Sequence, residues 1–402
     1  MNIAIFTDTY GPQINGVATS TQMLEKELVA RGHNVYIFTT TDPHARTSPP
    51  NVFRLPSMPF IFLPTHRFGL IYPPKLLLKT RKLKLDIIHT QTEFALGVFG
   101  RFIARFFKIP QVHTYHTVYE DYVHYIANGH LITPKMARKY SRIFCHGARA
   151  VIAPTAKTVD LLLSYGVERP LRIIPTGIDF EPFRRGKYTD DEINEIKCGL
   201  GVDLSAPVVV SVGRVAKEKS LDVVLGQFPA LLKKLPNAKF IIVGGGPLLA
   251  DLKTMAQTLG VADSVFFTGP QPWAQIGKYY QLGDVFVSAS TSETQGLTYI
   301  EAMAAKVAVC AKKDPAVDDI VINGETGYSF TQTEEIADTL YAALSDAEKR
   351  AQITERALAN IVHLSSNRFG EAVEGLYTQL VRAFPPRKRK KGAHRSKAAQ
   401  IE

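Results

Sequence analysis

The chain has 402 residues, 45% of them hydrophobic and 21% charged, which is the composition of a globular protein and a length that favours two domains. Its three cysteines lie far apart and form no C-x-x-C pair, so we expect neither a disulfide framework nor a zinc site, and this usage fits a reducing cytoplasm. We find no signal-peptide pattern at the N-terminus and no apolar run long enough to span a bilayer.

The formal net charge of +11 is concentrated in two zones. Residues 385–402 hold seven Lys or Arg against one Glu, and we expect this tail to be disordered because it cannot bury apolar surface. Residues 43–85 contain no Asp or Glu, while basic residues accumulate there. Such zones predict an anionic partner, which could be a nucleic acid, an acidic membrane surface or a phosphorylated substrate.

The first half of the chain alternates short apolar strands with amphipathic helices. The predicted strands cover residues 2–8, 35–41, 85–91, 110–116, 150–156 and 171–177. The predicted helices cover residues 20–32, 93–109 and 158–167. Repeated strand-helix-strand units predict a parallel, doubly wound sheet.

The alternation starts again after a junction near residues 175–185. Strands are predicted at 207–214, 238–247, 264–269 and 284–290, and helices at 220–235, 248–259 and 273–282. The fold class is therefore α/β, with two facing domains. Because ligands of open α/β sheets bind beyond the carboxyl ends of the strands, we expect the active site in the cleft between the domains.

Glycines and cations follow two strands of the second half. Gly213 and Arg214 come directly after a strand, and Lys219 lies five residues beyond Arg214. Arg offers a bidentate fork and Lys a point charge, so this turn predicts a phosphate cradle, the alternative being a solvated loop with incidental charges. The run centred on Gly245 ends in Pro247, which breaks the dinucleotide fingerprint and favours close approach of some other ligand to the backbone.

Two carboxylates flank a predicted helix start further along. Glu293 precedes the turn that contains Gly296 and Leu297, and Glu301 lies within the helix that follows. Backbone N–H groups at a helix start lack partners within the helix and can hold a phosphate. Carboxylates on either side of such a site suit the recognition of hydroxyl groups.

These motifs resemble those of the retaining glycosyltransferases of family 4, which have the GT-B fold of two facing Rossmann-like domains. The resemblance runs from the DTYGPQINGVATS loop to PTGID and beyond. It implies a nucleotide-sugar donor on the second domain, with Arg214 and Lys219 on the diphosphate, Glu293 on sugar hydroxyls and Glu301 on the ribose.

The same resemblance implies that the amides of Gly296 and Leu297 lie near the phosphates and that Gly16 comes close to donor and acceptor. His116 belongs to the segment Thr114-Tyr115-His116, which matches the family's T-x-H pattern, and the histidine of that pattern touches the donor sugar. The chain departs from the family at Lys306-Val307 and at residues 314–316, where glycines are usual. Those departures concern the packing of the donor's sugar end.

The resemblance also predicts the division of the chain. Residues 1–175 form an acceptor-facing and membrane-facing domain, and residues 176–364 form the nucleotide-sugar-binding domain. Residues 365–384 form a helix that crosses back to the first domain, and residues 385–402 form the basic tail.

The stretch YEDYVHYI resembles Gram-positive enzymes that glucosylate diacylglycerol, and its tyrosines suit either a lipid headgroup boundary or the core. This resemblance implies transfer of glucose from UDP-glucose to 1,2-diacylglycerol, with retention at the anomeric carbon. The chain contains no Asp-x-Asp, so a metal need not carry the diphosphate, and we expect no permanently bound cofactor.

An anionic membrane surface would explain the cationic zones, because residues 75–85 interleave leucines with basic residues. We therefore expect a cytoplasmic protein, peripheral on the inner face of the cell membrane. The helix at 93–109 is expected to pack on the sheet, with Arg101, Arg105 and Lys108 on its solvated face.

Several alternatives remain open. The enzyme could use UDP-galactose, or act on a glycosylated lipid or a soluble sugar, and a phosphorylase could share the fold. A nucleic-acid-binding role through the tail is weaker, since no reader motif accompanies it and no nucleic-acid partner is expected.

Overall fold

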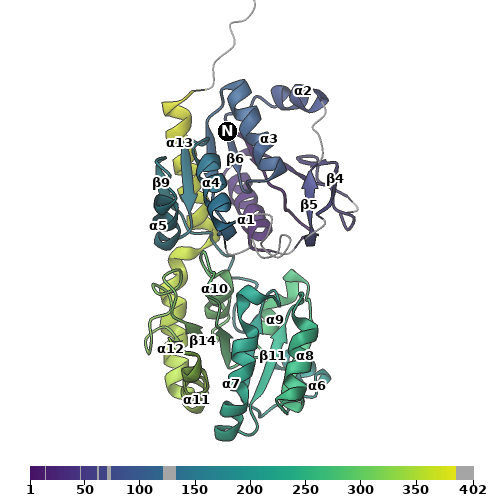
Figure 1. Cartoon of the computed structure of the whole chain (residues 1–402), viewed down its shortest axis with the longest axis vertical. Coiled ribbons are helices and arrows are strands. Elements are labelled where there is room, and N and C mark those ends of the chain that lie inside the picture. The colour runs from purple at the N-terminus through teal and green to yellow at the C-terminus, as the bar shows by residue number, and fades with distance from the viewer. Residues whose placement is uncertain (14, 46, 61–62, 70–73, 121–132, 386–402) are drawn as a thin grey trace, which may run out of the picture.

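The computed structural model describes residues 1–385 except positions 14, 46, 61–62, 70–73 and 121–132. Figure 1 shows two α/β units, one above the other, with the N-terminal half of the chain in the upper unit. The α/β class and the two parallel sheets predicted from the sequence are confirmed. The tail from residue 386 and the tyrosines at 122 and 125 lie outside the described residues.

The upper unit is built on a seven-stranded sheet of order β3-β2-β1-β6-β7-β8-β9, in which every pairing is parallel. Its strands are β1 (Asn2–Phe6), β2 (Asn34–Thr40), β3 (Val52–Leu55), β6 (Ile87–Thr90), β7 (Gln111–Thr114), β8 (Ala150–Ala153) and β9 (Leu171–Ile173). Its helices are α1 (Gly16–Ala30), α2 (Pro74–Lys82), α3 (Ala95–Phe107), α4 (Pro134–Cys145) and α5 (Ala156–Ser164).

Alternate side chains of β1 enter two different cores, because successive residues of a strand point to opposite faces of the sheet. Ile3 and Ile5 pack with α1, whereas Ala4 and Phe6 pack with α3. The helices therefore cover both faces, as expected for a doubly wound sheet.

A short hairpin stands apart from this sheet. β4 (Ser57–Phe60) and β5 (Leu63–Gly69) pair antiparallel in a sheet of two strands. β3, the hairpin, α2 and α4 were not predicted from the sequence. The side chains of Phe60 and Phe68, on these two strands, lie outside the described part of the chain.

The lower unit has a six-stranded parallel sheet of order β12-β11-β10-β13-β14-β15. Its strands are β10 (Val208–Val212), β11 (Lys239–Val243), β12 (Val265–Gly269), β13 (Val285–Ser288), β14 (Ala308–Lys312) and β15 (Tyr328–Phe330). Its helices are α6 (Asp190–Gly199), α7 (Leu221–Lys234), α8 (Leu249–Thr258), α9 (Ile276–Tyr280), α10 (Leu297–Ala304), α11 (Ile336–Ser345) and α12 (Ala347–Ile361).

The last helix, α13 (Ser366–Ala383), belongs to the core of the upper sheet (Figure 1). Val373 and Tyr377 are fully buried there with Ile3 and Ile5 of β1. The hydroxyl of Tyr377 also shares a hydrogen bond of 2.5 Å with Nδ1 of His89 on β6. The domain bounds given above stay a prediction, while the first strand and the last helix share one hydrophobic core.

The first helix begins earlier than the predicted residue 20. Oδ1 of Asn15 accepts a hydrogen bond of 2.9 Å from the backbone N–H of Ala18, which caps α1 at its N-terminus. The predicted start at residue 20 was wrong because the capping side chain of Asn15 sets the beginning of the helix at Gly16. No helix in the described part of the chain is long and apolar enough to cross a membrane.

Candidate active site

The carboxyl ends of the two sheets face each other, and side chains bond across the boundary. Oγ1 of Thr294 donates to the carbonyl oxygen of His116 at 3.1 Å, and the backbone N–H of Thr176 donates to Oε1 of Gln295 at 2.8 Å. A Cβ placed on Gly16 would lie 3.7 Å from Cδ1 of Leu297. The predicted residues Gly16 and His116 of the upper unit thus lie beside the loop of residues 293–297 of the lower unit.

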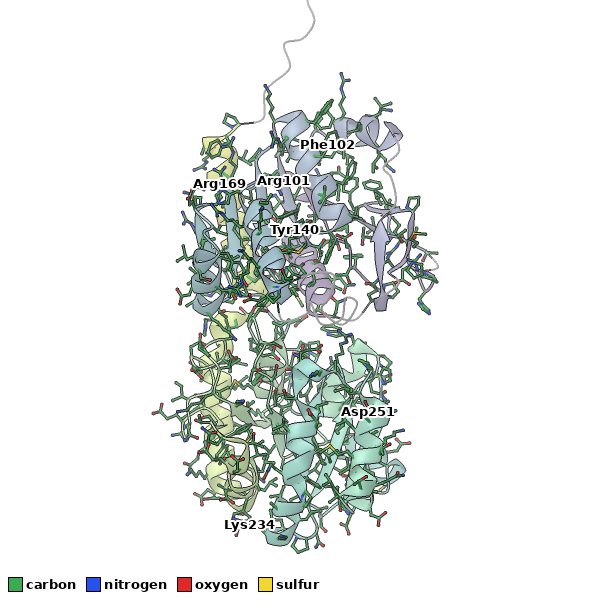
Figure 2. All side chains as sticks on the ribbon, in the orientation of Figure 1. Arg101, Phe102, Tyr140, Arg169, Lys234 and Asp251 are labelled. Carbon is green, nitrogen blue, oxygen red and sulfur yellow. The ribbon has the colours of Figure 1, made fainter. Side chains whose placement is uncertain are left out.

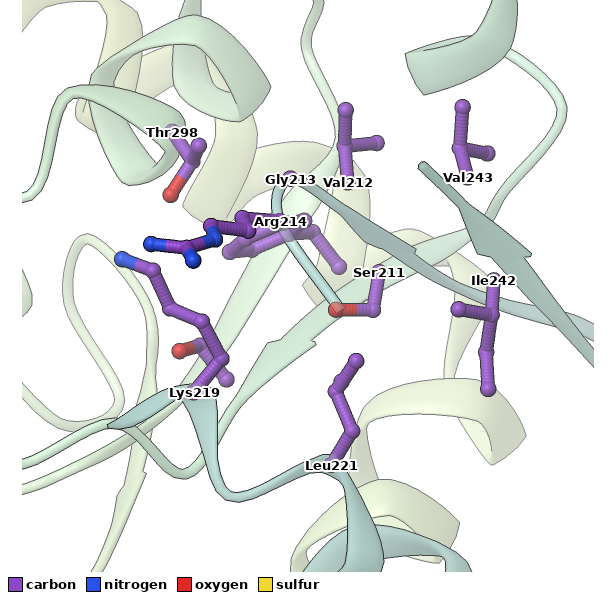
Figure 3. Close-up of a pocket in the computed structure, with 11 residues that line it drawn as sticks. Ser211, Val212, Gly213, Arg214, Lys219, Leu221, Ile242, Val243 and Thr298 are labelled. Carbon is purple, nitrogen blue, oxygen red and sulfur yellow. The ribbon is translucent and has the colours of Figure 1, made fainter. Parts of the chain in front are cut away.

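A small pocket lies at the ends of β10 and β11 (Figure 3). It is lined by residues that include Gly213, Arg214, Lys219 and Thr298. Figure 3 shows the guanidinium of Arg214 and the ammonium of Lys219 extending toward the same side of this pocket. Two cations held side by side repel each other, so the arrangement suits an anion bound between them.

Both cations have an acidic neighbour within the site. Nζ of Lys219 lies 2.6 Å from Oε1 of Glu293, and Nη1 of Arg214 lies 3.5 Å from Oε1 of Glu218. Burial alone would raise the pKa of Glu293, but the charge and hydrogen bond of Lys219, helped by Ser290 and Lys157, lower it below its usual range. Glu293 is therefore a buried, ionised acceptor of hydrogen bonds.

The helix start predicted near Gly296 is present. Gly296 precedes α10 with φ of 75°, and no side chain caps this helix. Its first N–H groups are therefore available to a ligand such as a phosphate. A Cβ at Gly296 would lie 2.6 Å from Cγ1 of Val317 and 2.9 Å from Cδ2 of Tyr299, so both conformation and space require glycine here.

Glu301 lies one turn into α10 and differs from Glu293 in its partners. It accepts a hydrogen bond of 2.6 Å from the hydroxyl of Tyr280. Burial raises the pKa of Glu301 to about 7, and the Tyr280 bond offsets only part of that effect. This carboxyl group therefore changes charge close to neutral pH.

The glycine run after β11 has a packing reason. A Cβ on Gly244 would overlap the carbonyl oxygen of Gly213, and one on Gly246 would overlap that of Val215. Gly245, the predicted ligand contact, has the side chain of Pro270 at 3.1 Å from a Cβ position. The two flanking glycines thus let the loops after β10 and β11 approach, and the donor role of Gly245 stays a prediction.

His116 is held by a residue that the sequence analysis missed. Nε2 of His116 lies 2.6 Å from Oε1 of Gln91, which follows β6. Burial, with the neighbouring His113, lowers the pKa of His116 to about 3, so the ring is neutral. Because an amide oxygen only accepts, Nε2 must carry the proton and Nδ1 is left as an acceptor.

A buried polar network supports this strand end. His113 bonds Oε1 of Glu93 at 3.0 Å, and the hydroxyl of Tyr119 donates to the same carboxylate. His113 is therefore a structural residue of the buried core. Gln91 and Glu93 follow the carboxyl end of β6, and β6 pairs with β7, the strand that leads to His116. That position was the sequence signal that could have revealed both residues.

A second missed feature is an ion pair between the units. Nζ of Lys157, on α5, lies 2.7 Å from Oδ1 and 2.8 Å from Oδ2 of Asp314, and it also donates to the carbonyl oxygen of Glu293 at 3.1 Å. Asp314 is buried, so a lysine of the upper unit neutralises a carboxylate that has little access to water.

Comparisons with known proteins identify the family of this chain. The model described as Glycosyltransferase Family 4 matches residues 14–182, and the one described as Glycosyl transferases group 1 matches residues 192–359. An alpha-monoglucosyldiacylglycerol synthase of Streptococcus pneumoniae is 40% identical over 95% of this chain and 86% of its own length. One from Acholeplasma laidlawii is 33% identical over 95% of this chain and 98% of its own.

Solved structures share the fold. Anabaena Alr3699/HepE in complex with UDP and glucose superposes with a TM-score of 0.77 at 17% identity, covering 94% of this chain and all of that one. WaaG, a glycosyltransferase involved in lipopolysaccharide biosynthesis, superposes with a TM-score of 0.69 at 16% identity, covering 94% and 99%. Within the part of the chain that is described, no group of three His, Cys, Asp or Glu could hold a metal ion.

Proposed function

This chain belongs to the family 4 glycosyltransferases and has their GT-B fold, and from that premise we propose that it transfers glucose from UDP-glucose to 1,2-diacylglycerol. The product is alpha-monoglucosyldiacylglycerol, a membrane glycolipid and a lipoteichoic acid anchor. The observation that carries the proposal is the 40% identity to a synthase of that product across 95% of the chain.

The lower unit holds the diphosphate of the donor. Arg214 and Lys219 line one pocket on the same side, and the first N–H groups of α10, at Gly296 and Leu297, supply further donors. Negative charge develops on the diphosphate as the glycosidic bond breaks. Preorganised donors and cations stabilise that charge and lower the barrier.

The two glutamates bind hydroxyl groups at opposite ends of the diphosphate. Glu301 accepts from the ribose, because it lies within α10 and next to Tyr280. Glu293 accepts from the glucose, since its ionised carboxylate lies beside Lys219 and across the boundary from His116. Nδ1 of the neutral His116 accepts from a sugar hydroxyl, and Gly16 leaves room for donor and acceptor.

The reaction retains the configuration at the anomeric carbon. The bond from C1 to the diphosphate oxygen breaks, and a bond from C1 to the acceptor oxygen forms on the same face. The proton of the acceptor hydroxyl passes to the departing phosphate, so no separate base is required. Lys219 and Arg214 carry the leaving group, and a metal is not essential.

Diacylglycerol resides in a bilayer, so the enzyme works as a peripheral protein on the inner face of the cell membrane. Basic side chains attract an anionic leaflet. Arg81, Lys82 and Lys84 at the end of α2 are exposed, while Leu76 and Leu77 of the same helix pack against the core of the upper unit. The helix thus supplies charge to that surface, and Leu78 remains as its exposed leucine.

The test is transfer of radiolabelled glucose from UDP-glucose into a lipid-soluble product, with diacylglycerol in vesicles. Arg214→Gln should abolish the product, whereas Arg184→Gln, an exposed arginine paired with Glu181 in the same unit, should leave it unchanged. UDP-galactose in a parallel reaction separates the two hexoses, and a chelator tests the metal-free reaction. If diacylglycerol gives no labelled lipid but a soluble sugar supplied as acceptor gives a labelled water-soluble product, the proposed acceptor is overturned.

A further inference from the structure

One side of α3 carries large apolar side chains that are exposed. Phe94 precedes the helix, and Val98, Phe102 and Phe106 follow at intervals of four residues, which places them on one side. Phe102 is 47% exposed and Phe106 61% exposed. Their ring centroids lie 5.8 Å apart in a stacked arrangement, so they form one aromatic surface.

The neighbouring helix extends this surface. Met136, Tyr140 and Ile143 of α4 are exposed at intervals of four and three residues. Nη1 of Arg101, on α3, donates to the carbonyl oxygen of Ile143 at 2.9 Å, which holds the helices side by side. Figure 2 shows Phe102, Arg101 and Tyr140 on the same side of the upper unit, and we call this surface the α3–α4 face.

Exposed apolar side chains are otherwise scattered. Among the described residues, no helix other than α3 and α4 has more than one large hydrophobic side chain that is exposed. Single exposed apolar residues are normal on a protein surface, but a contiguous group marks a site of interaction. The α3–α4 face is such a group.

The charge on this face has one sign. Neither α3 nor α4 contains an Asp or Glu, while Arg105 of α3 and Lys135, Lys139 and Arg142 of α4 are exposed. An acidic side chain, Glu120, pairs with Arg138 of α4 at 2.6 Å. An apolar stripe flanked by cations matches the boundary between headgroups and acyl chains of an anionic bilayer.

We infer that the α3–α4 face docks this protein on an anionic phospholipid bilayer, an inference that rests on the lipid acceptor proposed above. The stripe starts at Phe94, directly after Glu93, whose carbonyl oxygen accepts from the hydroxyl of Tyr140. Glu93 and Gln91 end the loop after β6 that supports His116. The apolar surface therefore begins at the edge of the cleft, where a lipid acceptor has to enter.

A second copy of this chain fits the same face less well. A symmetric dimer would place equal surfaces against each other, and the cations of one copy would meet those of the other. No carboxylate on either helix could neutralise them. A bilayer that contains anionic lipid supplies the opposite charge and an apolar interior together.

The test uses the full chain and sedimentation with vesicles of phosphatidylcholine, with or without phosphatidylglycerol. The double variant Phe102→Ser, Phe106→Ser should bind anionic vesicles more than about tenfold less tightly, because two half-exposed aromatic rings no longer enter the interface. The matched control is Leu163→Ser, Val362→Ser, whose side chains are 55% and 59% exposed on other elements and which should bind as the wild type does.

A second variant tests the charge. Arg105→Gln, Lys139→Gln should weaken binding to anionic vesicles by about 25-fold at low salt, since each basic residue near such a surface contributes about fivefold. Binding to vesicles of phosphatidylcholine alone should change little. Equal binding of anionic vesicles by the wild type and the aromatic double variant would overturn the proposal, as would a loss of equal size in the matched control.

Two further readouts separate docking from chemistry. Transfer to diacylglycerol dispersed in detergent and UDP affinity by calorimetry should be unchanged in the aromatic double variant, because its side chains lie outside the donor site. Vesicle binding without any transfer would defeat the proposed function and leave the docking face standing. A wild type that forms dimers, loses them in the double variant and does not bind vesicles would show that a second copy covers this face.

Discussion

Gly296 offers the sharpest test of how the proposed donor site is built. Substitution by alanine introduces two separate penalties, since the residue has φ of 75° and its Cβ would lie 2.6 Å from Cγ1 of Val317. Gly324 is a matched control in the same unit, because its φ is 76° and nothing lies within 4 Å of its Cβ position. The pair separates backbone strain from steric overlap.

The expected magnitudes follow from these contacts. The left-handed conformation with a Cβ costs about 1–2 kcal/mol, and this applies to both alanine variants. Overlap with a packed side chain adds about 1–3 kcal/mol at Gly296 alone. Because α10 begins at the next residue, the displacement should also move its first N–H groups and weaken UDP binding by about tenfold or more, the loss of one hydrogen bond to a charged group.

Urea unfolding followed by tryptophan fluorescence measures the first quantity. The single tryptophan, Trp273, lies in the lower unit with its ring against Phe183, so its signal reports on the unit that contains both glycines. Calorimetric titration with UDP measures the second. Equal destabilisation of the Gly296→Ala and Gly324→Ala variants, or unchanged UDP affinity in Gly296→Ala, would refute the reasoning.

Three further predictions concern the polar groups of the site. Gln91→Leu removes the acceptor of the Nε2 proton of His116, so kcat should fall by about tenfold or more. Nitrogen NMR of this variant should show a mixture of the two neutral tautomers of His116, with the proton on Nε2 or on Nδ1. Because burial raises the pKa of Glu301 to about 7, UDP affinity should fall as pH drops from about 8 to about 6, and Glu301→Gln should remove this dependence. Lys157→Met leaves the Asp314 carboxylate unpaired and should lower the free energy of unfolding by about 1–3 kcal/mol, measured in urea.

Each of these three predictions has a further measurement, a control variant or an outcome that would contradict it. The raised pKa of Glu301 means that the folded protein binds this proton more tightly than the unfolded chain. Its contribution to stability is therefore present below about pH 4.5 and lost as pH rises through about 7, and Glu301→Gln should flatten that slope. Lys26→Met breaks an exposed pair with Asp179 between the units and should change the free energy of unfolding by less than about 1 kcal/mol. A Gln91→Leu enzyme with normal kcat would show that His116 needs no fixed tautomer.

Much of the fold could be predicted because both sheets are parallel and covered on both faces. Their strands, such as Val208–Val212 and Lys239–Val243, therefore read as short continuous apolar runs that end in glycine. Two of the missed features do not read as such runs, because Val52–Leu55 lies at the edge of its sheet and the hairpin of residues 57–69 contains proline and polar residues. Those elements depend on what packs beside them.

The proposed donor site could be predicted from the sequence for a similar reason. Arg214, Lys219, Glu293 and Gly296 belong to local motifs at strand ends, where topology already predicts a ligand site. Gln91 is 25 positions from His116 in the sequence, and Lys157 is 157 from Asp314. The position of Gln91 at a strand's carboxyl end marks it as a candidate site residue, but no local pattern links Gln91 to His116 or Lys157 to Asp314.

The exposed face of α3 could not be predicted from the sequence either. Its sequence ALGVFGRFIARFF has enough apolar residues for either side of the helix, and periodicity could not decide which aromatic rings would be covered. The sequence by itself determined the two α/β units, the cations and the carboxylates, because a short chain segment suffices to specify a strand, a turn or a helix start. Only the tertiary structure decided which buried charges are paired, which histidine tautomer is held and which apolar face stays exposed. Those properties are set by neighbours that folding brings together from distant parts of the chain.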